Sequence, residues 1–482
     1  MVDHSDLRKR FEDAKQSHVF DNYDSLGDEE KLSFDAQLST IPVENLEGFL
    51  TAAKAIVAND SKSITPFSGP VVSIAEGKEQ NENNDVNTWR QVGLQAIKEG
   101  KVAALVLAGG QGTRLGFDGP KGCYDIGMPS KKTLFQLLSE RILRLQKLAS
   151  DLSDDGEAAQ SIKKLCLYIM TSPLNHEETV SFFQSHNNFS IEVYFFPQGM
   201  LPCLSESDGK ILLEGPGRVA MAPDGNGGIY PALESSGMLA QMETSGVEYL
   251  HVFSIDNALC RPADPVFCGY CINVQADCGN KVLWKASAHE KVGVLAEQNG
   301  KSCIVEYSDI TTDMAELTDD NGKLVFGAAN ICNHFYTLKF LKEQVLPNMA
   351  NMYHVARKKI PFYDGSSTVH PTTPNGVKLE SFIFDVFPFS KTMAVMNVSR
   401  ASEFAPVKNA SGNDSPESAR IMLSTLAKEM VSEAGAKLKN VDGDKDENES
   451  NFICEVSPLT SYAGEGLSSE YNGKEIICPF SI

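Results

Sequence analysis

The sequence predicts an α/β protein that is built on a mostly parallel sheet. Four continuous apolar runs of strand length alternate with stretches that have helical spacing of apolar residues, and a glycine-rich loop directly follows the first run. Strands that are apolar on both faces are typical of parallel sheets, and the alternation of strand and helix implies right-handed crossovers. Ligands of such folds bind at the carboxyl ends of the strands.

Each element follows from its own pattern. Strands are predicted over residues 102–107, 165–170, 191–196 and 249–255, where every position or nearly every position is apolar. Helices are predicted over residues 133–148, 175–184 and 233–244, between these strands. We therefore expect the loops after residues 107 and 255 to lie at the same edge of the sheet.

Changes of pattern along the chain predict three regions. Residues 1–100 read as a helical region, with Leu7, Phe11 and Ala14 on one helix face and a loop or linker over residues 61–86. Residues 101–395 read as a central Rossmann-like domain. Residues 396–482 read as a small α+β domain, with a helix over 415–433, a charged loop over 437–451 and short strands near 452–456 and 475–478.

Composition and charge exclude several classes of function. The chain has 482 residues, of which 42% are apolar and 22% are charged, and its formal net charge is −21. Such an acidic molecule repels nucleic acid and anionic lipid, so neither is an expected partner, and any phosphate site must be a local basic pocket. The chain has no apolar run of membrane-spanning length and no signal-peptide pattern at its start, and its eleven cysteines suit a reducing compartment. We therefore expect a cytoplasmic protein without a membrane partner.

The sharpest local feature is the loop that follows the first predicted strand. Leu107, Ala108, Gly109 and Gly110 begin it, and Arg114 and Lys121 follow. Glycines let backbone N–H groups approach a ligand closely, and successive N–H groups form a concave anion site. Leu115 stands where a dinucleotide fingerprint needs its last glycine, and no Gly-Lys-Ser/Thr follows at P-loop spacing, so the loop belongs to neither class.

This loop resembles the signature of nucleotidyltransferases that join a sugar 1-phosphate to a nucleoside triphosphate. Further motifs are similar, in order and over nearly the whole chain, to the eukaryotic UDP-N-acetylglucosamine pyrophosphorylases. They are Gln198–Pro202, Met221–Gly228, Ile255–Asn257, Val305–Ser308, Asn330–Phe335, Pro374–Lys378, Pro406–Ala410 and Ser457–Gly466.

The resemblance implies a reaction. An oxygen of N-acetylglucosamine 1-phosphate attacks the α-phosphorus of UTP, and pyrophosphate leaves with UDP-N-acetylglucosamine as the other product. Positioning and charge neutralisation supply most of the catalysis in such transfers. The cofactor implied is Mg²⁺ (or Mn²⁺), and the expected assembly is a monomer or homodimer.

The resemblance also implies roles for individual residues. Arg114, Lys121 and Lys408 are the catalytic cations, and Asp256, a carboxylate after a strand, is the metal ligand as well as a nucleotide contact. The remaining nucleotide contacts are Leu107, Ala108, Gly109, Gly110, Lys121, Gln198, Gly225 and Lys378. The substrate contacts are Asn226, Gly293, Glu306 and Asn330.

Two other functions remain open at this point. One is a UDP-sugar pyrophosphorylase of broad specificity, and the other is a non-catalytic sensor that binds UDP-sugars. A sensor is disfavoured because the charged residues named above are all present. Two apparent metal motifs are also rejected: Cys268 and Cys271 have no second pair at zinc-ribbon spacing, and the acidic run 442–446 has Glu447 where a calcium loop needs glycine.

Overall fold

The structure is a computed structural model that describes residues 4–59, 64–74, 83–152, 163–440 and 453–482. The chain forms two compact units. The first comprises Met1–Ile64, Gln198–Ser235 and Lys342–Phe389, and the second comprises Thr65–Pro197, Ser236–Leu341 and Ser390–Ile482. Within the described residues, no helix is both long enough and apolar enough to cross a membrane.

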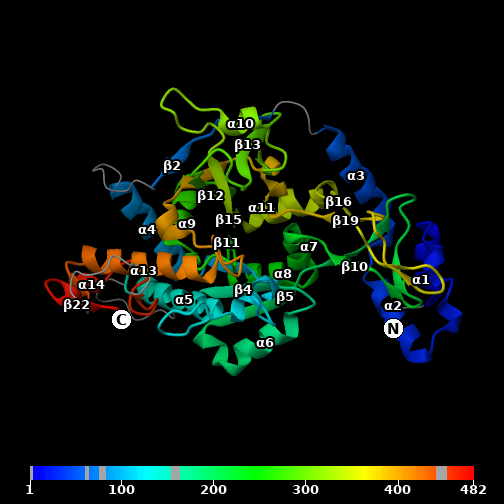
Figure 1. The fold of residues 1–482 in the computed structure, drawn as a ribbon, viewed down its shortest axis with the longest axis horizontal. Coiled ribbons are helices and arrows are strands. Elements are labelled where there is room, and N and C mark those ends of the chain that lie inside the picture. The colour runs from blue at the N-terminus through cyan, green and yellow to red at the C-terminus, as the bar shows by residue number, and fades with distance from the viewer. Residues whose placement is uncertain (1–3, 60–63, 75–82, 153–162, 441–452) are drawn as a thin grey trace. The chain divides into compact units, whose positions relative to one another are not determined.

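The second unit is built on a sheet whose main path has the strand order β2-β20-β12-β15-β11-β3-β4-β5. All neighbours along this path are parallel except those of β15, which runs antiparallel to β11 and β12 (Figure 1). The strands are β2 (Val71–Ser73), β20 (Met393–Asn397), β12 (Cys278–Trp284), β15 (Ala328–Thr337), β11 (Tyr249–Ser254), β3 (Val102–Leu107), β4 (Cys166–Thr171) and β5 (Glu192–Pro197). The hairpin β13 (Val294–Gln298) and β14 (Lys301–Val305) joins β15, and β1 (Ile64–Pro66) pairs with β13.

Helices cover both faces of this sheet. On one face, α4 (Asn83–Lys98), α5 (Leu134–Ser150) and α9 (Pro265–Asn273) enclose an apolar core with alternate residues of β3 and β4. On the other face lies α8 (Met238–Ser245), whose Gln241 accepts a hydrogen bond from the Tyr168 hydroxyl in β4. Thr133 caps α5 by accepting a hydrogen bond from the Gln136 amide (3.2 Å), which satisfies one of the free N–H groups of the first turn.

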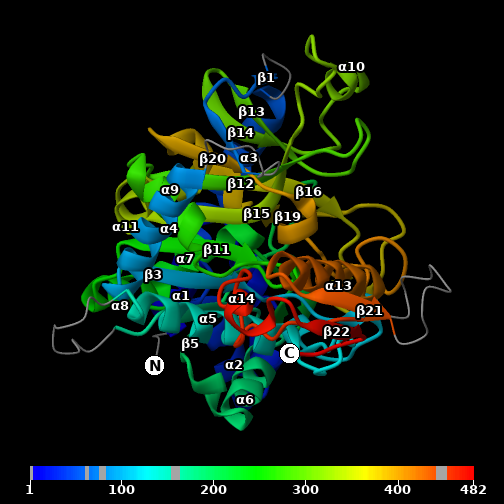
Figure 2. The same cartoon turned by 90° about the vertical axis from the view of Figure 1, so that its left-hand side faces the viewer.

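The C-terminal part of this unit packs around one long helix. That helix is α13 (Pro416–Glu433), and Ser415 caps it by accepting a hydrogen bond from the Ser418 amide. Figure 2 shows α13 beside α14 (Leu467–Tyr471) and the parallel pair β21 (Lys437–Asn440) and β22 (Glu475–Cys478). The short helices α10 (Thr312–Glu316), α11 (Leu338–Phe340), α12 (Arg400–Glu403) and α6 (His176–Ser185) complete the unit.

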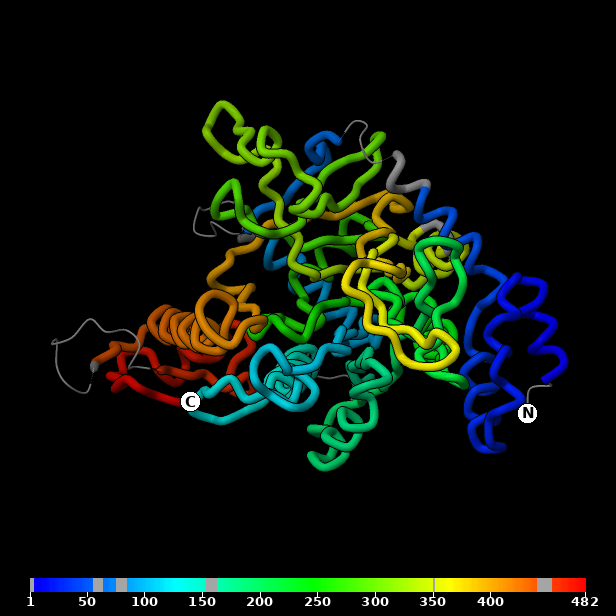
Figure 3. The backbone as a smooth tube through the Cα atoms, turned by 45° about the vertical axis from the view of Figure 1, so that its right-hand side comes forward, coloured from blue at the N-terminus to red at the C-terminus, as the bar shows by residue number. Residues whose placement is uncertain are grey.

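The first unit is a helical layer packed on small sheets. Its helices are α1 (His4–Asp13), α2 (Asp28–Ser39), α3 (Leu46–Asn59) and α7 (Ile229–Ser235). Its strands are β6 (Met200–Pro202), β7 (Leu204–Ser205), β8 (Leu213–Gly215), β9 (Arg218–Val219), β10 (Met221–Pro223), β16 (His354–Lys358), β17 (Phe362–Tyr363), β18 (Thr368–Val369) and β19 (Gly376–Glu380). β19 lies between β16 and β7, so chain segments far apart in sequence run side by side, as the green and yellow stretches of Figure 3 show. Leu7, Phe11 and Phe34 are almost fully buried in an apolar cluster that also contains Val377 and Leu379 of β19.

The four central strands predicted over residues 102–107, 165–170, 191–196 and 249–255, the strand predicted near 475–478 and the mostly parallel sheet are confirmed, and four local predictions are wrong. The charged loop expected over 437–451 begins with β21 at residues 437–440, because this stretch pairs with β22. Residues 453–456, where a short strand was expected, form only an isolated bridge between Glu455 and Ser481. The stretch 61–86 contains β1 and β2 in place of a continuous loop. The helix expected over 233–244 is two helices, because Gly237 between α7 and α8 has a left-handed φ of 75°. Cys268 and Cys271 are buried free thiols on α9, as expected, whereas the acidic run 442–446 lies outside the described residues. The three-region division stays a prediction.

Candidate active site

The glycine-rich loop leaves the sheet at the carboxyl end of β3. The Leu107 carbonyl accepts a hydrogen bond from the Ile255 amide (3.2 Å), and the Ala108 amide donates to the Met170 carbonyl (2.8 Å). The start of the loop is therefore fixed to both neighbouring strands. In the described part of the chain, no hydrogen bond is made by the amides of Gly109, Gly110 or Gln111.

A buried asparagine sets the direction in which these amides point. Asn175, just before α6, donates from Nδ2 to the carbonyls of Ala108 (3.0 Å) and Gly110 (3.4 Å). In a trans peptide the N–H points opposite to the C=O, so the amides of Gly109 and Gln111 point away from Asn175. No sequence motif had indicated a role for this residue. Its only sequence signal is a polar side chain that precedes a helix after a buried strand.

The loop returns as a tight hairpin that carries Lys121. The Gly112 amide donates to the Gly119 carbonyl (2.9 Å), and the Lys121 amide donates to the Gly110 carbonyl (3.1 Å). Lys121 is partly buried at the end of this hairpin, whereas Arg114 is exposed on the short helical turn Thr113–Leu115. Both cations thus come from one loop that is anchored at its two ends.

Asp256 and Lys408 come together at the end of the neighbouring strand. Asp256 follows β11, and its carbonyl accepts a hydrogen bond from the Val407 amide (2.8 Å). Asn257 strengthens this junction, because its side chain donates to the Glu403 carbonyl (2.7 Å) and accepts from the Ala405 amide (2.9 Å). The Nζ of Lys408 lies 4.0 Å from Oδ2 of Asp256. Asn257 is a second positioning residue to which sequence reasoning gave no role.

The charges at this junction act on Lys121, the cation of the hairpin. The pKa of Lys121 lies below its usual value, mainly because burial disfavours the charged ammonium. Asp256 opposes that effect, and the positive charges of Lys408 and Arg114 add to it. Lys121 therefore lies within electrostatic range of Asp256, Lys408 and Arg114, and Lys408 lies close to Asp256. This grouping brings three cations and one carboxylate together, as a local basic site in an acidic protein would require.

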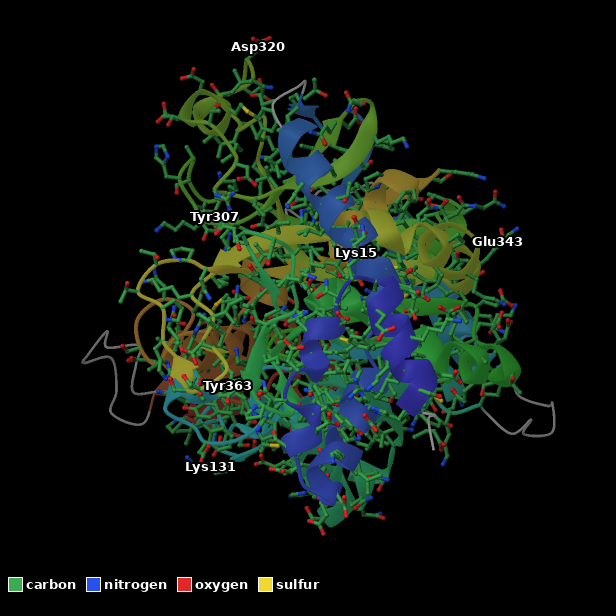
Figure 4. The ribbon with its side chains drawn as sticks, turned by 90° about the vertical axis from the view of Figure 1, so that its right-hand side faces the viewer. Lys15, Lys131, Tyr307, Asp320, Glu343 and Tyr363 are labelled. Carbon is green, nitrogen blue, oxygen red and sulfur yellow. The ribbon has the colours of Figure 1, made fainter. Side chains whose placement is uncertain are left out.

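The three residues predicted to bind the N-acetylhexosamine also meet in the second unit. The Asn330 amide donates to the Gly293 carbonyl (2.9 Å), and a methyl group at Gly293 would lie 3.0 Å from Oε1 of Glu306. β15 is antiparallel to β11 and pairs Asn333 with Phe253, which places Asn330 beyond the paired end of β11, at the edge where Asp256 lies. Tyr307, next to Glu306, is exposed (Figure 4).

The remaining predicted residues belong to the first unit. Gly225 has a φ of 87°, and a Cβ there would lie 2.3 Å from the Ser381 carbonyl oxygen, so only glycine fits. The side-chain Oδ1 of Asn226 accepts a hydrogen bond from the Ile383 amide (3.0 Å). The side-chain amide nitrogen of Asn226 has no partner in the described residues. Lys378 lies in β19, and Gln198 follows the end of β5 and is partly buried.

The predicted site residues thus divide between the two units. The first group, Arg114, Lys121, Asp256, Lys408, Gly293, Glu306 and Asn330, lies in the second unit, and the second group, Gln198, Gly225, Asn226 and Lys378, lies in the first. Asp224, next to Gly225, is a further buried group that sequence reasoning did not single out. Burial raises the pKa of its carboxyl to about 7, so it holds a proton far more readily than an exposed aspartate.

A metal ion fits this arrangement only if substrate supplies most of its ligands. Across the described ranges no group of three or more His, Cys, Asp and Glu side chains could hold an ion. Asp256 is a single carboxylate whose side chain is 17% exposed. Mg²⁺ is commonly held by one or two carboxylates together with substrate phosphates and water. The donor set therefore fits Mg²⁺ that arrives with a nucleotide, rather than a resident metal.

Comparison with known proteins places the chain in a family. The family model for UTP–glucose-1-phosphate uridylyltransferase (UDPGP) matches residues 46–439. A probable UDP-N-acetylglucosamine pyrophosphorylase of Dictyostelium discoideum is 40% identical over 99% of this chain and 97% of its own length. The UDP-N-acetylglucosamine pyrophosphorylase of Saccharomyces cerevisiae is 39% identical over 98% of both chains. The chain belongs to the UDPGP family.

Solved structures agree with the sequence relatives. The uridine diphosphate N-acetylglucosamine pyrophosphorylase of Trypanosoma brucei superposes with a TM-score of 0.83 at 31% identity, over 97% of this chain and 95% of that one. The α/β fold with a mostly parallel sheet is therefore the fold of this UDPGP branch. The resemblance to UDP-N-acetylglucosamine pyrophosphorylases that the sequence motifs indicated is confirmed.

Proposed function

We propose that this UDPGP-family protein transfers the uridylyl group of UTP to N-acetylglucosamine 1-phosphate, forming UDP-N-acetylglucosamine and pyrophosphate. The observation that carries the proposal is the grouping of Asp256, Lys408 and Arg114 about Lys121, beside backbone amides of the glycine-rich loop that make no hydrogen bond in the described residues. Full-length similarity to UDP-N-acetylglucosamine pyrophosphorylases supports this choice of substrates. The eleven free thiols support the cytoplasm as the setting.

In the proposed reaction the chain's own residues bind and orient, and no protein group changes its covalent state. An oxygen of the sugar phosphate forms a bond to the α-phosphorus of UTP as the bond from that phosphorus to the bridging oxygen of pyrophosphate breaks. The amides of Gly109 and Gln111 would hold phosphate oxygens, because Asn175 binds the carbonyls of the same peptide groups and so turns the N–H groups away from itself. Lys121 and Arg114 neutralise the charge that develops on the leaving pyrophosphate.

Lys408 and Asp256 would act on the other side of the transferred group. Lys408 draws in the attacking sugar phosphate and holds it against the uridylyl phosphate, a positioning effect that lowers the entropic cost of reaction. Asp256 would be the protein ligand of Mg²⁺, which when bound would neutralise phosphate charge as a Lewis acid. Asn257 would hold the side chains of Lys408 and Asp256 in position, because it fixes residues 403–405 to the turn after β11.

Sugar selection is assigned to Gly293, Glu306 and Asn330. Asn330 can offer an amide to the acetamido group, and the missing side chain of Gly293 leaves space beside the Glu306 carboxylate. In the first unit, Gln198 and Gly225 would contact the uracil. Asn226, whose side-chain amide nitrogen has no partner among the described residues, would contact the sugar.

A substrate panel tests the proposal and its two alternatives. Pyrophosphate release is measured with UTP, CTP and GTP against the 1-phosphates of N-acetylglucosamine, N-acetylgalactosamine, glucose and galactose. We expect UTP with N-acetylglucosamine 1-phosphate to have the highest kcat/KM. Comparable rates with glucose 1-phosphate would favour a broad UDP-sugar pyrophosphorylase, and binding of UDP-sugars without any pyrophosphate release would favour a sensor.

A further inference from the structure

Lys281 is a buried lysine of the second unit to which the proposed reaction gives no part. It lies in β12, and its side chain is 0% exposed. Its ammonium donates to Oε2 of Glu403 (3.0 Å) and also pairs with the carboxylate of Asp264, and both of these residues are almost fully buried. Burial lowers the pKa of Lys281, but the two carboxylates raise it by more, so that it lies above its usual value. Lys281 is therefore a charged group in the protein interior.

The two carboxylates belong to the two chain segments that meet at the junction of Asp256 and Lys408. Asp264 follows Asp256 along the chain, and its Oδ1 caps α9 by accepting a backbone hydrogen bond (3.1 Å), while its Oδ2 pairs with Lys281. Glu403 ends α12 and precedes Lys408. One ammonium on the sheet therefore holds both segments, the one that leaves Asp256 and the one that leads to Lys408.

Hydrogen bonds of the main chain carry this placement to the junction itself. The Glu403 carbonyl accepts a hydrogen bond from the Asn257 side chain (2.7 Å). The Val407 amide then donates to the Asp256 carbonyl (2.8 Å). Because Nζ of Lys408 lies 4.0 Å from Oδ2 of Asp256, a shift of one segment along the other would change this separation directly.

Stability alone does not account for a buried ion pair at this place. Removing charges from water costs free energy that offsets most of their attraction, so apolar residues of similar volume often stabilise a fold equally well. An ion pair adds a fixed geometry, because the ammonium must meet each carboxylate at hydrogen-bond distance. Arg261 supports the same arrangement, with Nη1 3.4 Å from Oε1 of Glu403. These contacts therefore suit a role in holding the two segments in position.

We propose that Lys281 is a positioning residue for the junction of Asp256 and Lys408. By binding Asp264 and Glu403 at once, it fixes the two segments relative to each other. The inference rests on the proposed function, since it concerns how Asp256 meets the Mg²⁺ that arrives with UTP. Loss of a residue that orients a metal ligand typically weakens metal binding or activity by roughly 10- to 100-fold.

The test neutralises all three side chains, because removing Lys281 alone would leave buried carboxylates unpaired and destabilise the fold. The triple variant is Lys281→Met/Asp264→Asn/Glu403→Gln, in which the amides keep the shape of the carboxylates and asparagine can still cap α9. UTP affinity is measured by isothermal titration, once with Mg²⁺ and once with EDTA. The ratio of the two affinities reports the contact between protein and metal without any turnover. Asp256→Asn gives the ratio expected when that contact is lost.

The wild type should bind UTP more tightly with Mg²⁺ than with EDTA. In the triple variant this ratio should fall by roughly 10-fold, toward the value of Asp256→Asn, while UTP affinity in EDTA stays close to that of the wild type. The kcat for pyrophosphate release should fall as well. Glu403→Gln alone is a milder second variant, because Lys281 keeps its pair with Asp264, and its ratio should fall by a smaller factor.

Lys132→Met/Glu140→Gln is the matched control. Lys132 precedes α5 and pairs with Glu140 of that helix (2.7 Å) in a mostly buried site of the same unit. In the described part of the chain neither residue is bonded to residues 256–264 or 403–408, so this variant should keep the wild-type ratio.

The inference is overturned if the folded triple variant and Glu403→Gln both keep the wild-type ratio, or if the control lowers the ratio as much as the triple variant does. A wild type whose UTP affinity does not respond to Mg²⁺ would instead contradict the metal role in the proposed function, and this inference with it.

Discussion

Gly110→Ala separates the stability of the glycine-rich loop from its proposed contact with the nucleotide. A Cβ built on Gly110 meets no atom within 4 Å, and the backbone there is not left-handed, so alanine fits the protein itself. Loss of freedom in the unfolded chain should raise the free energy of unfolding by about 0.4–1 kcal/mol. The methyl group would, however, occupy space through which phosphate oxygens approach the amides. Overpacking costs about 1–3 kcal/mol, which corresponds to roughly 5- to 150-fold weaker UTP binding.

The assay compares two quantities in two variants. UTP affinity is measured by isothermal titration without sugar phosphate, and stability is measured by urea unfolding. The matched control is Gly48→Ala, an exposed glycine of α3 whose added Cβ also meets nothing within 4 Å. The control should gain stability and keep its UTP affinity. If Gly110→Ala binds UTP as tightly as the control does, the backbone of this loop does not approach the nucleotide.

Three further predictions concern single side chains. Lys121→Ala should reduce kcat by orders of magnitude with folding intact. The pKa of Lys121 lies below its usual value, so the kcat/KM of the wild type should fall on the alkaline side at a lower pH than the usual pKa of lysine would give. A pH–rate profile of both proteins measures the two effects. Asn330→Ala should narrow the preference for N-acetylglucosamine 1-phosphate over glucose 1-phosphate, mainly by lowering kcat/KM for the former, whereas an unchanged ratio would mean that Asn330 only supports β15. The carboxyl of Asp224 has a folded-state pKa of about 7, above its unfolded value, so stability should decline as pH rises through that interval. Asp224→Asn should therefore raise the unfolding temperature more at pH 8 than at pH 5, because the unfolded carboxyl is already partly ionised at pH 5; equal shifts at both pH values would contradict the buried neutral acid.

The sequence predicted the parallel strands well because burial on both faces produces continuous apolar runs. β3 and β11 begin and end within a residue of the predicted ranges. β15 was not predicted because its Asn330, Asn333 and His334 interrupt the apolar pattern, and its paired neighbours, not its own residues, keep it in the sheet. β1 and β2 were missed for a related reason: three-residue strands have too few positions to reveal a period of two.

Some residues of the candidate site could be predicted from neighbouring sequence, and others depend on contacts between distant parts of the chain. The residues of the glycine-rich loop could be proposed from sequence because glycines and cations follow one buried strand. Asn175 and Asn257 could not be proposed, since each acts through carbonyls or amides that only the folded chain brings within reach. The trio Gly293, Glu306 and Asn330 came from resemblance alone, and its geometry depends on the pairing of β13 with β14 and β15.

We propose that the sugar phosphate attacks the α-phosphorus of UTP at the grouping of Lys121, Asp256 and Lys408. An isotope experiment follows ¹⁸O from the non-bridging phosphate oxygens of N-acetylglucosamine 1-phosphate, with ³²P at the α-position of UTP. We expect both labels to be retained in UDP-N-acetylglucosamine and pyrophosphate to carry neither. We also expect Asp256→Asn to abolish this transfer while the protein stays folded. Appearance of ¹⁸O in the released pyrophosphate, or transfer at the wild-type rate in Asp256→Asn, would contradict it.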